Sequence, residues 1–139
     1  HPEGEGMARA MRAALDQARL APGAVGYANA HGTATLQNDR IEARAIQEVF
    51  GEGRLLVSST KSMVGHTMAA AGALEAVATV LALVHELIPP TANLTTPDPA
   101  VAFDCVPRFA RDAAVEAAIS NSFGFGGQNV TLLFTRAPR

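Results

Sequence analysis

Apolar residues recur at helical spacing in three stretches of the chain, and short apolar runs lie between them. In residues 4–20 they recur every three or four positions, which predicts an amphipathic helix that Pro22 and Gly23 end. The same spacing predicts a second helix, which starts at residue 38 or 39 and ends at Phe50. Residues 67–87 are almost all apolar and predict a long, buried helix that ends before a pair of prolines.

Four apolar runs between and after these helices are typical of buried strands. Two of them, 24–30 and 54–59, lie between predicted helices, and polar loops follow both. The runs 117–123 and 129–135 are joined by the glycine-rich turn 124–128, which favours an antiparallel pair. The order is therefore helix, strand, helix, strand, helix and two strands. This order predicts an α/β fold with a layered sheet covered on both faces.

Composition narrows the possible classes of protein. The 139 residues are 48% hydrophobic and 17% charged, with a formal net charge of −2. This size and apolar content suit one domain with its own core. Because the chain has no cluster of lysine and arginine, we exclude a nucleic-acid-binding protein. Cys105 is the only cysteine, so the chain forms no internal disulfide.

Two features of the sequence bear on membrane association: a possible signal peptide and a possible membrane-spanning helix. The first fifteen residues lack the basic start and apolar segment of a signal peptide, and the chain lacks an initiator methionine, which suggests a fragment or a processed product. Residues 68–84 are apolar but carry Glu75 near their centre. A charge at that position is unfavourable in a bilayer, so we expect a buried helix rather than a membrane span.

Polar loops with candidate chemistry follow three of the predicted strands. The first carries His31, the second carries Lys61 and His66, and the third is the segment 121–127. Ligands of open α/β sheets bind at the carboxyl ends of strands, where these loops would meet. Each residue also has a structural interpretation: a buried histidine can serve as a hydrogen-bonding group, a loop lysine can be solvated, and GFGG can be only a tight turn. The histidines lack metal-ligand spacing, and GFGGQN lacks the helix of a phosphate loop.

Three segments decide between these interpretations. NAHGTATLQNDRIEARAI, SSTKSMVGHTMAAAGALEAV and SNSFGFGGQNVTLLF occur in this order and resemble the β-ketoacyl-acyl-carrier-protein synthases, the condensing enzymes of fatty-acid and polyketide assembly. The resemblance covers residues 4–134 and is closest to the bacterial elongation type. It implies a thiolase-like fold, in which two similar halves form a five-layered α-β-α-β-α body. Residues 1–139 match the C-terminal half.

The resemblance implies a division of labour between the two halves. The nucleophilic cysteine belongs to the N-terminal half, which this chain lacks, and Cys105 is interpreted as a packing residue. The reaction is the decarboxylative condensation of a malonyl group with an enzyme-bound acyl group. His31 and His66 match the two catalytic histidines, whose N–H groups would stabilise the enolate oxygen. Lys61 matches a buried lysine behind them, which needs counter-charges to remain buried.

Further residues match supporting and substrate-binding positions of the family. Asp39 and Glu42 match acidic residues near the lysine, and Glu75 matches a buried glutamate close to the site. Thr33 and Thr35 match threonines whose hydroxyls contact the phosphopantetheine arm. Phe125 matches a gating aromatic that its flanking glycines allow to move. The remaining loop positions are Gly124, Gly126 and Asn121. Three departures from the family pattern bear on substrate choice, namely Ala34, Leu36 and Gln128.

The resemblance also implies the setting of the reaction. The substrates arrive on the phosphopantetheine of acyl carrier protein, and the enzyme has no cofactor of its own. We expect a cytoplasmic homodimer or heterodimer that binds neither nucleic acid nor membrane, and we expect this chain to be inactive without its N-terminal half.

Two alternative functions remain. One is a non-catalytic partner subunit that determines the chain length made by an active ketosynthase, and the other is a module that binds a carrier protein or a lipid. The retained His31, Lys61 and His66 favour the enzyme over the partner subunit. A cysteine on a strand-to-helix turn ahead of this region would favour the enzyme, and a substitution there would favour the partner.

Overall fold

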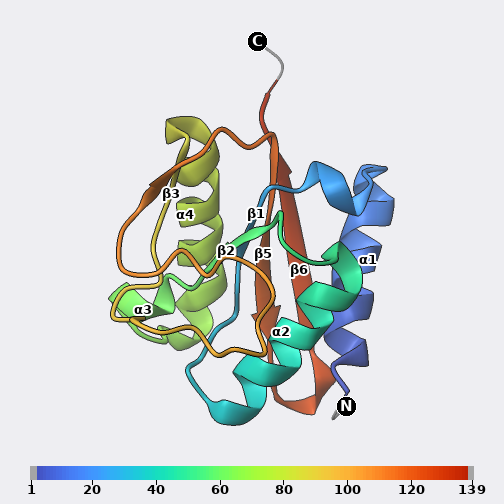
Figure 1. Cartoon of the computed structure of the whole chain (residues 1–139). Helices are drawn as coiled ribbons and strands as arrows, with labels where there is room; N and C mark the ends of the chain where they lie inside the picture. Colours follow the sequence, from blue (N-terminus) through green and yellow to red (C-terminus); the bar gives the residue numbers. More distant parts are fainter. Residues whose placement is uncertain (1–2, 138–139) are drawn as a thin grey trace.

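A mixed four-stranded sheet lies at the centre of the molecule, with helices on both faces (Figure 1). The computed structural model describes residues 3–137. The strand order is β2-β1-β5-β6, with bounds Tyr27–Asn29 for β1, Leu56–Ser58 for β2, Ala117–Phe123 for β5 and Asn129–Thr135 for β6. Strand β1 is parallel to both β2 and β5, whereas β5 and β6 are antiparallel. The carboxyl ends of β1, β2 and β5 therefore meet at one edge.

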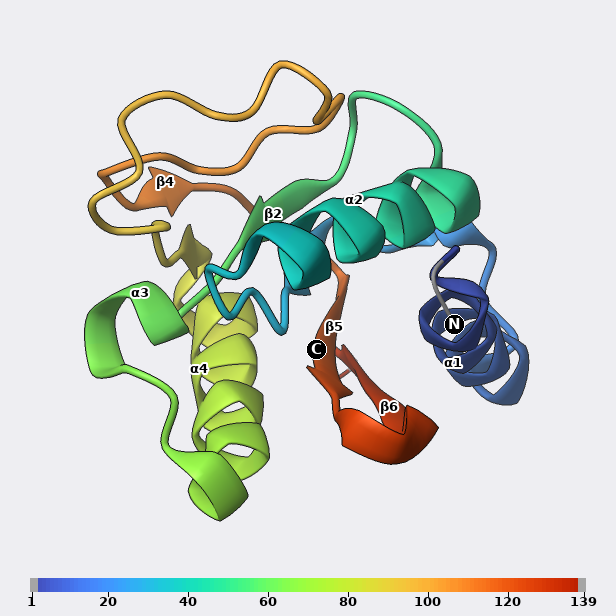
Figure 2. The same cartoon turned by 90° about the horizontal axis from the view of Figure 1, so that it is seen from below.

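Helices pack on the sheet according to their apolar faces. α1 (Glu5–Ala18) and α2 (Leu36–Phe50) lie on one side, and α4 (Ala71–His85) lies on the other, as Figure 2 shows from below. Buried residues of α1 and α2 join β1, β2 and β5 in one hydrophobic cluster. Ala82 and Leu83 of α4 pack with Tyr27 and Ala118 of the sheet in a second cluster. Burial of these two apolar faces drives the layered arrangement.

Short elements complete the chain. The helix α3 (Lys61–Val64) is a single turn, and β3 (Leu87–Ile88) pairs antiparallel with β4 (Arg111–Asp112) in a separate small sheet. Three 3₁₀ turns occupy Pro22–Ala24 (η1), Met68–Ala70 (η2) and Phe125–Gly127 (η3).

The predicted order of the three long helices and the four strands of the central sheet is confirmed, and several bounds are corrected. The strands β3 and β4 were not predicted, because residues 91–113 were expected to be irregular and residue 87 was expected to end the long helix. β5 and β6 have the predicted bounds and the predicted antiparallel pairing. β1 and β2 are shorter than predicted, with three residues each. The predicted loop 60–66 contains α3, and the long helix begins at Ala71 instead of residue 67. Gly65 and Met68 have positive φ angles of 76° and 54°, which a continuous helix does not allow.

α4 is only partly the buried helix that the sequence predicts. Its inner face is buried against the sheet, but five large apolar residues on the opposite side are exposed, and we call them the α4 outer face: Leu74, Val77, Val80, Leu81 and Val84. Within the described residues, Met68–His85 is long and apolar enough to cross a membrane by length and composition alone, and 28% of it is buried. That criterion is weak evidence for a span, because core helices of soluble proteins also meet it.

Candidate active site

The loop that carries His31 is held by a buried carboxylate. One oxygen of Glu42 on α2 accepts the backbone N–H of His31 at 2.8 Å, and the other accepts the N–H of Gly32 at 2.9 Å. The side-chain amides of Asn38 and Asn121 donate to the same carboxylate, each at 3.4 Å. Burial raises the pKa of Glu42, and these four hydrogen bonds act in the opposite direction. Glu42 therefore fixes the path of the backbone as it leaves β1.

The His31 loop also packs tightly against the loop that follows β2. Gly32 has a φ of +39°, and a Cβ atom there would lie 2.6 Å from both Cβ and Oγ of Ser59. The hydroxyl of Ser59 donates to the carbonyl oxygen of Gly32 at 3.0 Å. Only glycine permits this approach, so the two loops are held in direct contact.

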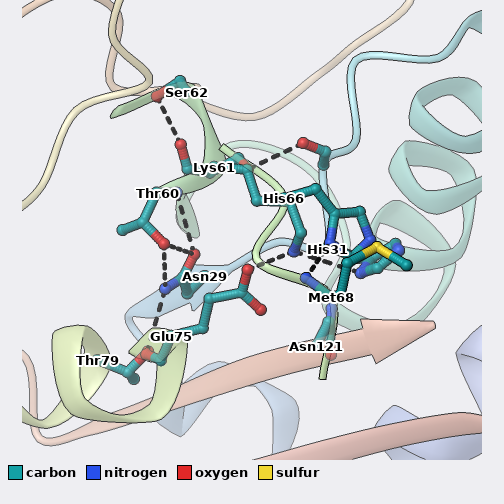
Figure 3. A network of polar contacts seen from close by, with 12 residues as sticks. Asn29, His31, Thr60, Lys61, Ser62, His66, Met68, Glu75, Thr79 and Asn121 are labelled. Atoms are coloured by element: carbon teal, nitrogen blue, oxygen red, sulfur yellow. Dashed lines mark hydrogen bonds and ion pairs between the residues drawn. The ribbon is translucent and has the colours of Figure 1, made fainter. Parts of the chain in front are cut away.

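Lys61 is buried behind His31 and forms an ion pair with Glu75 of α4. The two side chains are only 4% and 3% exposed. The lysine Nζ also lies 3.4 Å from Nδ1 of His31. The lysine therefore bridges a carboxylate and an imidazole inside the protein (Figure 3).

The ion-pair partner corrects one expectation from the resemblance. Asp39 and Glu42 were the expected counter-charges of Lys61, but its partner in the structure is Glu75. The carboxylate of Glu42 is occupied by backbone N–H groups and amides. Asp39 is exposed in the first turn of α2, where its carboxylate accepts a hydrogen bond from Asn38 and complements the helix dipole.

His66 lies beside His31, on the segment that follows α3. The two ring centroids are 5.6 Å apart and the rings are nearly perpendicular, at 88°. Nδ1 of His66 accepts the backbone N–H of Met68 at 3.2 Å. In this chain His31 is buried, whereas His66 is exposed. The structure thus brings together His31, Lys61 and His66 from two loops of the sheet edge.

The contacts of both imidazoles specify where their protons lie. Burial, and then the electrostatic effects of Lys61 and His66, lower the pKa of His31 to about 4, so this ring is neutral at physiological pH. An ammonium and a backbone N–H can only donate, so Nδ1 must accept in each histidine. Each ring then carries its proton on Nε2. The pair can present two N–H donors to one oxygen of a ligand.

The residues predicted to bind substrate occupy different environments. The hydroxyls of Thr33 and Thr35 lie 3.0 Å apart on the loop before α2. Phe125 is fully exposed on η3, next to Gly126 with its φ of +78°. Asn121 is completely buried in β5, where it accepts a hydrogen bond from Thr131 of β6 at 2.8 Å and donates to Glu42. Asn121 therefore supports the site from within the sheet.

A cavity of about 320 Å³ lies on the α2 side of the sheet, next to the segment 91–105. Its lining is mainly apolar and includes Leu36, Leu94, Phe103 and Cys105. Burial and the nearby Asp104 raise the pKa of the Cys105 thiol to about 11. A thiol that stays protonated at neutral pH is a poor nucleophile, which agrees with its interpretation as a packing residue. Among residues 3–137, no group of His, Cys, Asp or Glu has the arrangement of a metal site.

One buried polar residue beside the site was missed by sequence reasoning. Asn29, in β1, is fully buried and bonds to Thr60 and to the backbone of Glu75. The available signal was a single amide within the apolar run AVGYANA, since a buried amide needs hydrogen-bond partners.

Comparisons with known proteins identify the family of this chain. The family model described as the C-terminal domain of β-ketoacyl synthase matches residues 1–95. The chain is 50% identical over 137 residues to 3-oxoacyl-[acyl-carrier-protein] synthase 2 of Synechocystis, which covers 97% of this chain. The chain spans about a third of the length of that relative, 33%.

Solved structures share the fold. The ishigamide ketosynthase/chain length factor superposes with a TM-score of 0.95 at 40% identity, covering 99% of this chain and 35% of that one. A type II polyketide ketosynthase in complex with its acyl-carrier protein, AntDE:AntF, superposes with a TM-score of 0.94 at 36% identity, covering 99% and 34%. These matches confirm the predicted thiolase-like α/β fold. The chain belongs to the β-ketoacyl synthase family, as a C-terminal part of a ketosynthase.

Proposed function

We propose that this chain supplies the His/His/Lys half of the active site of a β-ketoacyl-acyl-carrier-protein synthase. The complete enzyme would condense malonyl-acyl-carrier protein with an enzyme-bound acyl group in fatty-acid or polyketide synthesis. The observation that carries the proposal is the cluster of His31 and His66, 5.6 Å apart, with Nζ of Lys61 3.4 Å from His31. Three polar side chains from two separate segments have no shared packing role that would bring them to one sheet edge.

The two imidazoles would act as hydrogen-bond donors. When the malonyl carboxylate leaves as carbon dioxide, its bonding electrons form an enolate, and negative charge develops on the thioester oxygen. Nε2–H groups of His31 and His66 would stabilise that charge as it forms. A neutral His31 suits this role, because its pKa of about 4 leaves one ring proton at neutral pH and the contact between Nδ1 and Lys61 keeps that proton on Nε2. The enolate carbon then attacks the acyl thioester and displaces the cysteine thiolate of the N-terminal half.

The α4 outer face supports the proposal that the N-terminal half packs against this chain. This face is entirely apolar, and Val130 and Leu132 of β6 are also exposed. Exposed apolar patches of this extent mark interaction surfaces. The chain spans about a third of its Synechocystis relative, so a large part of such a synthase lies outside it. The proposed five-layered body places α4 in the middle layer, where its outer face would be covered.

The proposed partners follow from the same reaction. Acyl carrier protein would deliver the substrates on its phosphopantetheine arm, and Thr33 and Thr35 would bind that arm while Phe125 gates the acyl tunnel. The AntDE:AntF structure contains an acyl-carrier protein bound to its ketosynthase. We propose the same class of partner here, a cytoplasmic dimer, and no cofactor on the enzyme itself.

The test compares the whole synthase that carries this chain with the isolated chain. We expect the whole protein to release carbon dioxide from malonyl-acyl-carrier protein and the isolated 139 residues to release none. In the whole protein, His31→Ala and His66→Ala should each lower the rate by about 10²-fold or more, the loss typical of an oxyanion donor. His85→Ala, an exposed histidine at the end of α4, is the matched control and should leave the rate unchanged. Turnover by the isolated chain would contradict the proposal.

A second function is favoured by one observation. The ishigamide match is a ketosynthase together with its chain length factor, so partner subunits share this fold. A non-catalytic subunit would have no use for the buried Lys61–Glu75 pair beside His31, which favours the enzyme. The residue at the nucleophile position of the whole protein discriminates the two: cysteine supports the synthase, and any other residue supports the partner subunit.

A further inference from the structure

Asn29 connects the three segments of the chain that carry His31, Lys61 and Glu75. It lies in β1, two residues before His31, and none of its surface is exposed. Its Nδ2 lies 3.2 Å from Oγ1 of Thr60 and 3.3 Å from the backbone oxygen of Glu75. Its Oδ1 lies 3.4 Å from both the backbone nitrogen and Oγ1 of Thr60. Figure 3 shows the amide between the Thr60 segment and α4.

The chemistry of its partners fixes the orientation of this amide. The carbonyl of Glu75 can only accept a hydrogen bond, so the amide nitrogen must face it. The backbone N–H of Thr60 can only donate, so the amide oxygen must face Thr60. No other side chain of similar size offers both a donor and an acceptor in this arrangement. An aspartate would lose the donor, and a leucine would lose both.

The partners of Asn29 are the immediate supports of the ion pair. Thr60 directly precedes Lys61, and Glu75 is the residue that pairs with Lys61. The hydroxyl of Thr79 donates to the same Glu75 carbonyl at 2.7 Å. This second hydrogen bond holds the same turn of α4 from within the helix. Asn29 thus ties the backbone of both ion-pair partners to the strand that leads into His31.

We propose that Asn29 is a positioning residue that keeps Nζ of Lys61 within hydrogen-bond distance of His31 Nδ1. The inference rests on the proposed function, and it adds a residue that touches neither substrate nor imidazole. Asn29 acts through Lys61: without the amide, Thr60 and Glu75 are free to separate from β1, and the lysine no longer holds the Nε2–H form of His31. The oxyanion donor then loses its fixed orientation.

A second buried polar pair on the same strands provides a matched control. The hydroxyls of Tyr27 in β1 and Ser58 in β2 lie 2.9 Å apart. This pair links the two strands as Asn29 does, but it contacts neither Thr60 nor the Lys61–Glu75 pair through any hydrogen bond within the described residues. Ser58→Ala therefore removes a buried hydrogen bond of the sheet without releasing Lys61.

The test is a double-mutant cycle on malonyl-acyl-carrier-protein decarboxylation by the whole synthase. We expect Asn29→Ala to lower kcat on the order of tenfold or more with KM nearly unchanged, since a positioning defect acts after binding. Ser58→Ala should stay within about twofold of wild type. In a Lys61→Met background, Asn29→Ala should have almost no further effect, because the residue it positions is gone. Asn29→Leu, which keeps a similar size, adds no charge and loses both the donor and the acceptor, serves if Asn29→Ala does not fold, with the same expected loss.

A spectroscopic measurement separates this inference from the proposed function. In the same protein, NMR titration of the imidazoles should show the pKa of His31 rising from about 4 in the Asn29 variants and staying in place in Ser58→Ala, because Lys61 lowers that pKa. An unmoved His31 pKa, equal losses in Asn29→Ala and Ser58→Ala, or additive losses with Lys61→Met would overturn the positioning role. A wild-type synthase that does not decarboxylate malonyl-acyl-carrier protein would instead overturn the proposed function, and the titration would still decide the role of Asn29.

Discussion

Glu42 shows how a single buried carboxylate can organise the loop around His31. Its two oxygens accept the backbone N–H groups of His31 and Gly32, so the negative charge is used to hold backbone atoms. Burial alone would make such a charge unfavourable, and the hydrogen bonds offset part of the lost hydration, although the pKa of Glu42 remains raised. A glutamine of the same size could not do this, because one of its two ends donates.

Glu42→Gln is therefore expected to destabilise the protein although it hardly changes volume. Its NH₂ group must face the backbone N–H of either His31 or Gly32, and one buried donor loses its acceptor. The free energy of unfolding should fall by about 1–3 kcal/mol, measured by urea unfolding. Asp39→Asn, at an exposed carboxylate one turn earlier, is the matched control and should change it by less than about 0.5 kcal/mol. Equal effects of the two changes would show that Glu42 has no special role.

His31 gives the stability of the fold a defined pH dependence. The ordinary pKa of histidine is 6.5, and burial with the effects of Lys61 and His66 lowers it to about 4 in the folded protein. Between these two values the unfolded chain binds more protons than the folded one, so the free energy of unfolding falls as the pH falls from 6.5 to 4. Lys61→Met should raise the pKa of His31 toward 6.5.

The measurement is an imidazole NMR titration combined with urea unfolding at several pH values. The Lys61→Met variant should lose less stability than wild type as the pH falls from 6.5 to 4. The reason is that the pKa of His31 in its folded state would lie closer to the pKa in the unfolded chain. Arg12→Met is the control, because Arg12 is an exposed cation that pairs with Glu48 on the surface. A His31 pKa that does not move in Lys61→Met would refute the electrostatic link.

At the scale of elements, the segments that the sequence predicted best are those with long apolar patterns of their own. β5 and β6 were predicted with their bounds, because seven-residue apolar runs flank a glycine-rich turn. α3 was missed, since a single turn carries no periodic pattern. The partner of Lys61 was also misjudged: residues 61 and 75 meet only because α4 packs against β1 and β5, and no local spacing encodes that contact.

Contact between the His31 loop and the loop that follows β2 depends on Gly32. In Gly32→Ala the new Cβ would lie 2.6 Å from Ser59, and the backbone would keep a φ of +39°. Both effects are unfavourable, so we expect a loss of about 2–3 kcal/mol in the free energy of unfolding and a longer His31–Lys61 distance.

Gly126→Ala separates strain from the clash. Gly126 has a φ of +78° and a ψ of 6°, in the left-handed region, and an added Cβ would meet nothing within 4 Å. This change should lower the free energy of unfolding by only about 1 kcal/mol, from strain alone. Thermal unfolding of both variants is the measurement, and an equal loss of stability would mean that the packing of Gly32 on Ser59 contributes nothing.

At the scale of the whole molecule, the distribution of apolar surface distinguishes the two sides of the sheet. α1 and α2 cover one side with amphipathic helices whose outer faces are largely polar. α4 covers the other side, and its outer face is apolar and exposed, although its buried face includes Glu75 and Thr79. A helix with apolar residues on both faces is typically covered on both. The α4 side of the molecule therefore lacks a covering layer, as we expect if α4 lies in the middle layer of the proposed synthase.

Charges placed on the α4 outer face should therefore have opposite effects in the isolated chain and in the whole synthase. Leu74→Glu combined with Val77→Glu should reduce self-association of the isolated chain, measured by light scattering after size-exclusion chromatography, because repulsive charges replace exposed apolar surface. In the whole synthase the same double change would bury two unpaired carboxylates, so the yield of folded protein and its Tm should fall sharply. Leu36→Glu, at an exposed leucine on the α2 side of the sheet, should alter neither the self-association of the isolated chain nor the Tm of the synthase. If the doubly substituted synthase folded with an unchanged Tm, the N-terminal half would not lie on α4, and the five-layered arrangement proposed here would have to be abandoned.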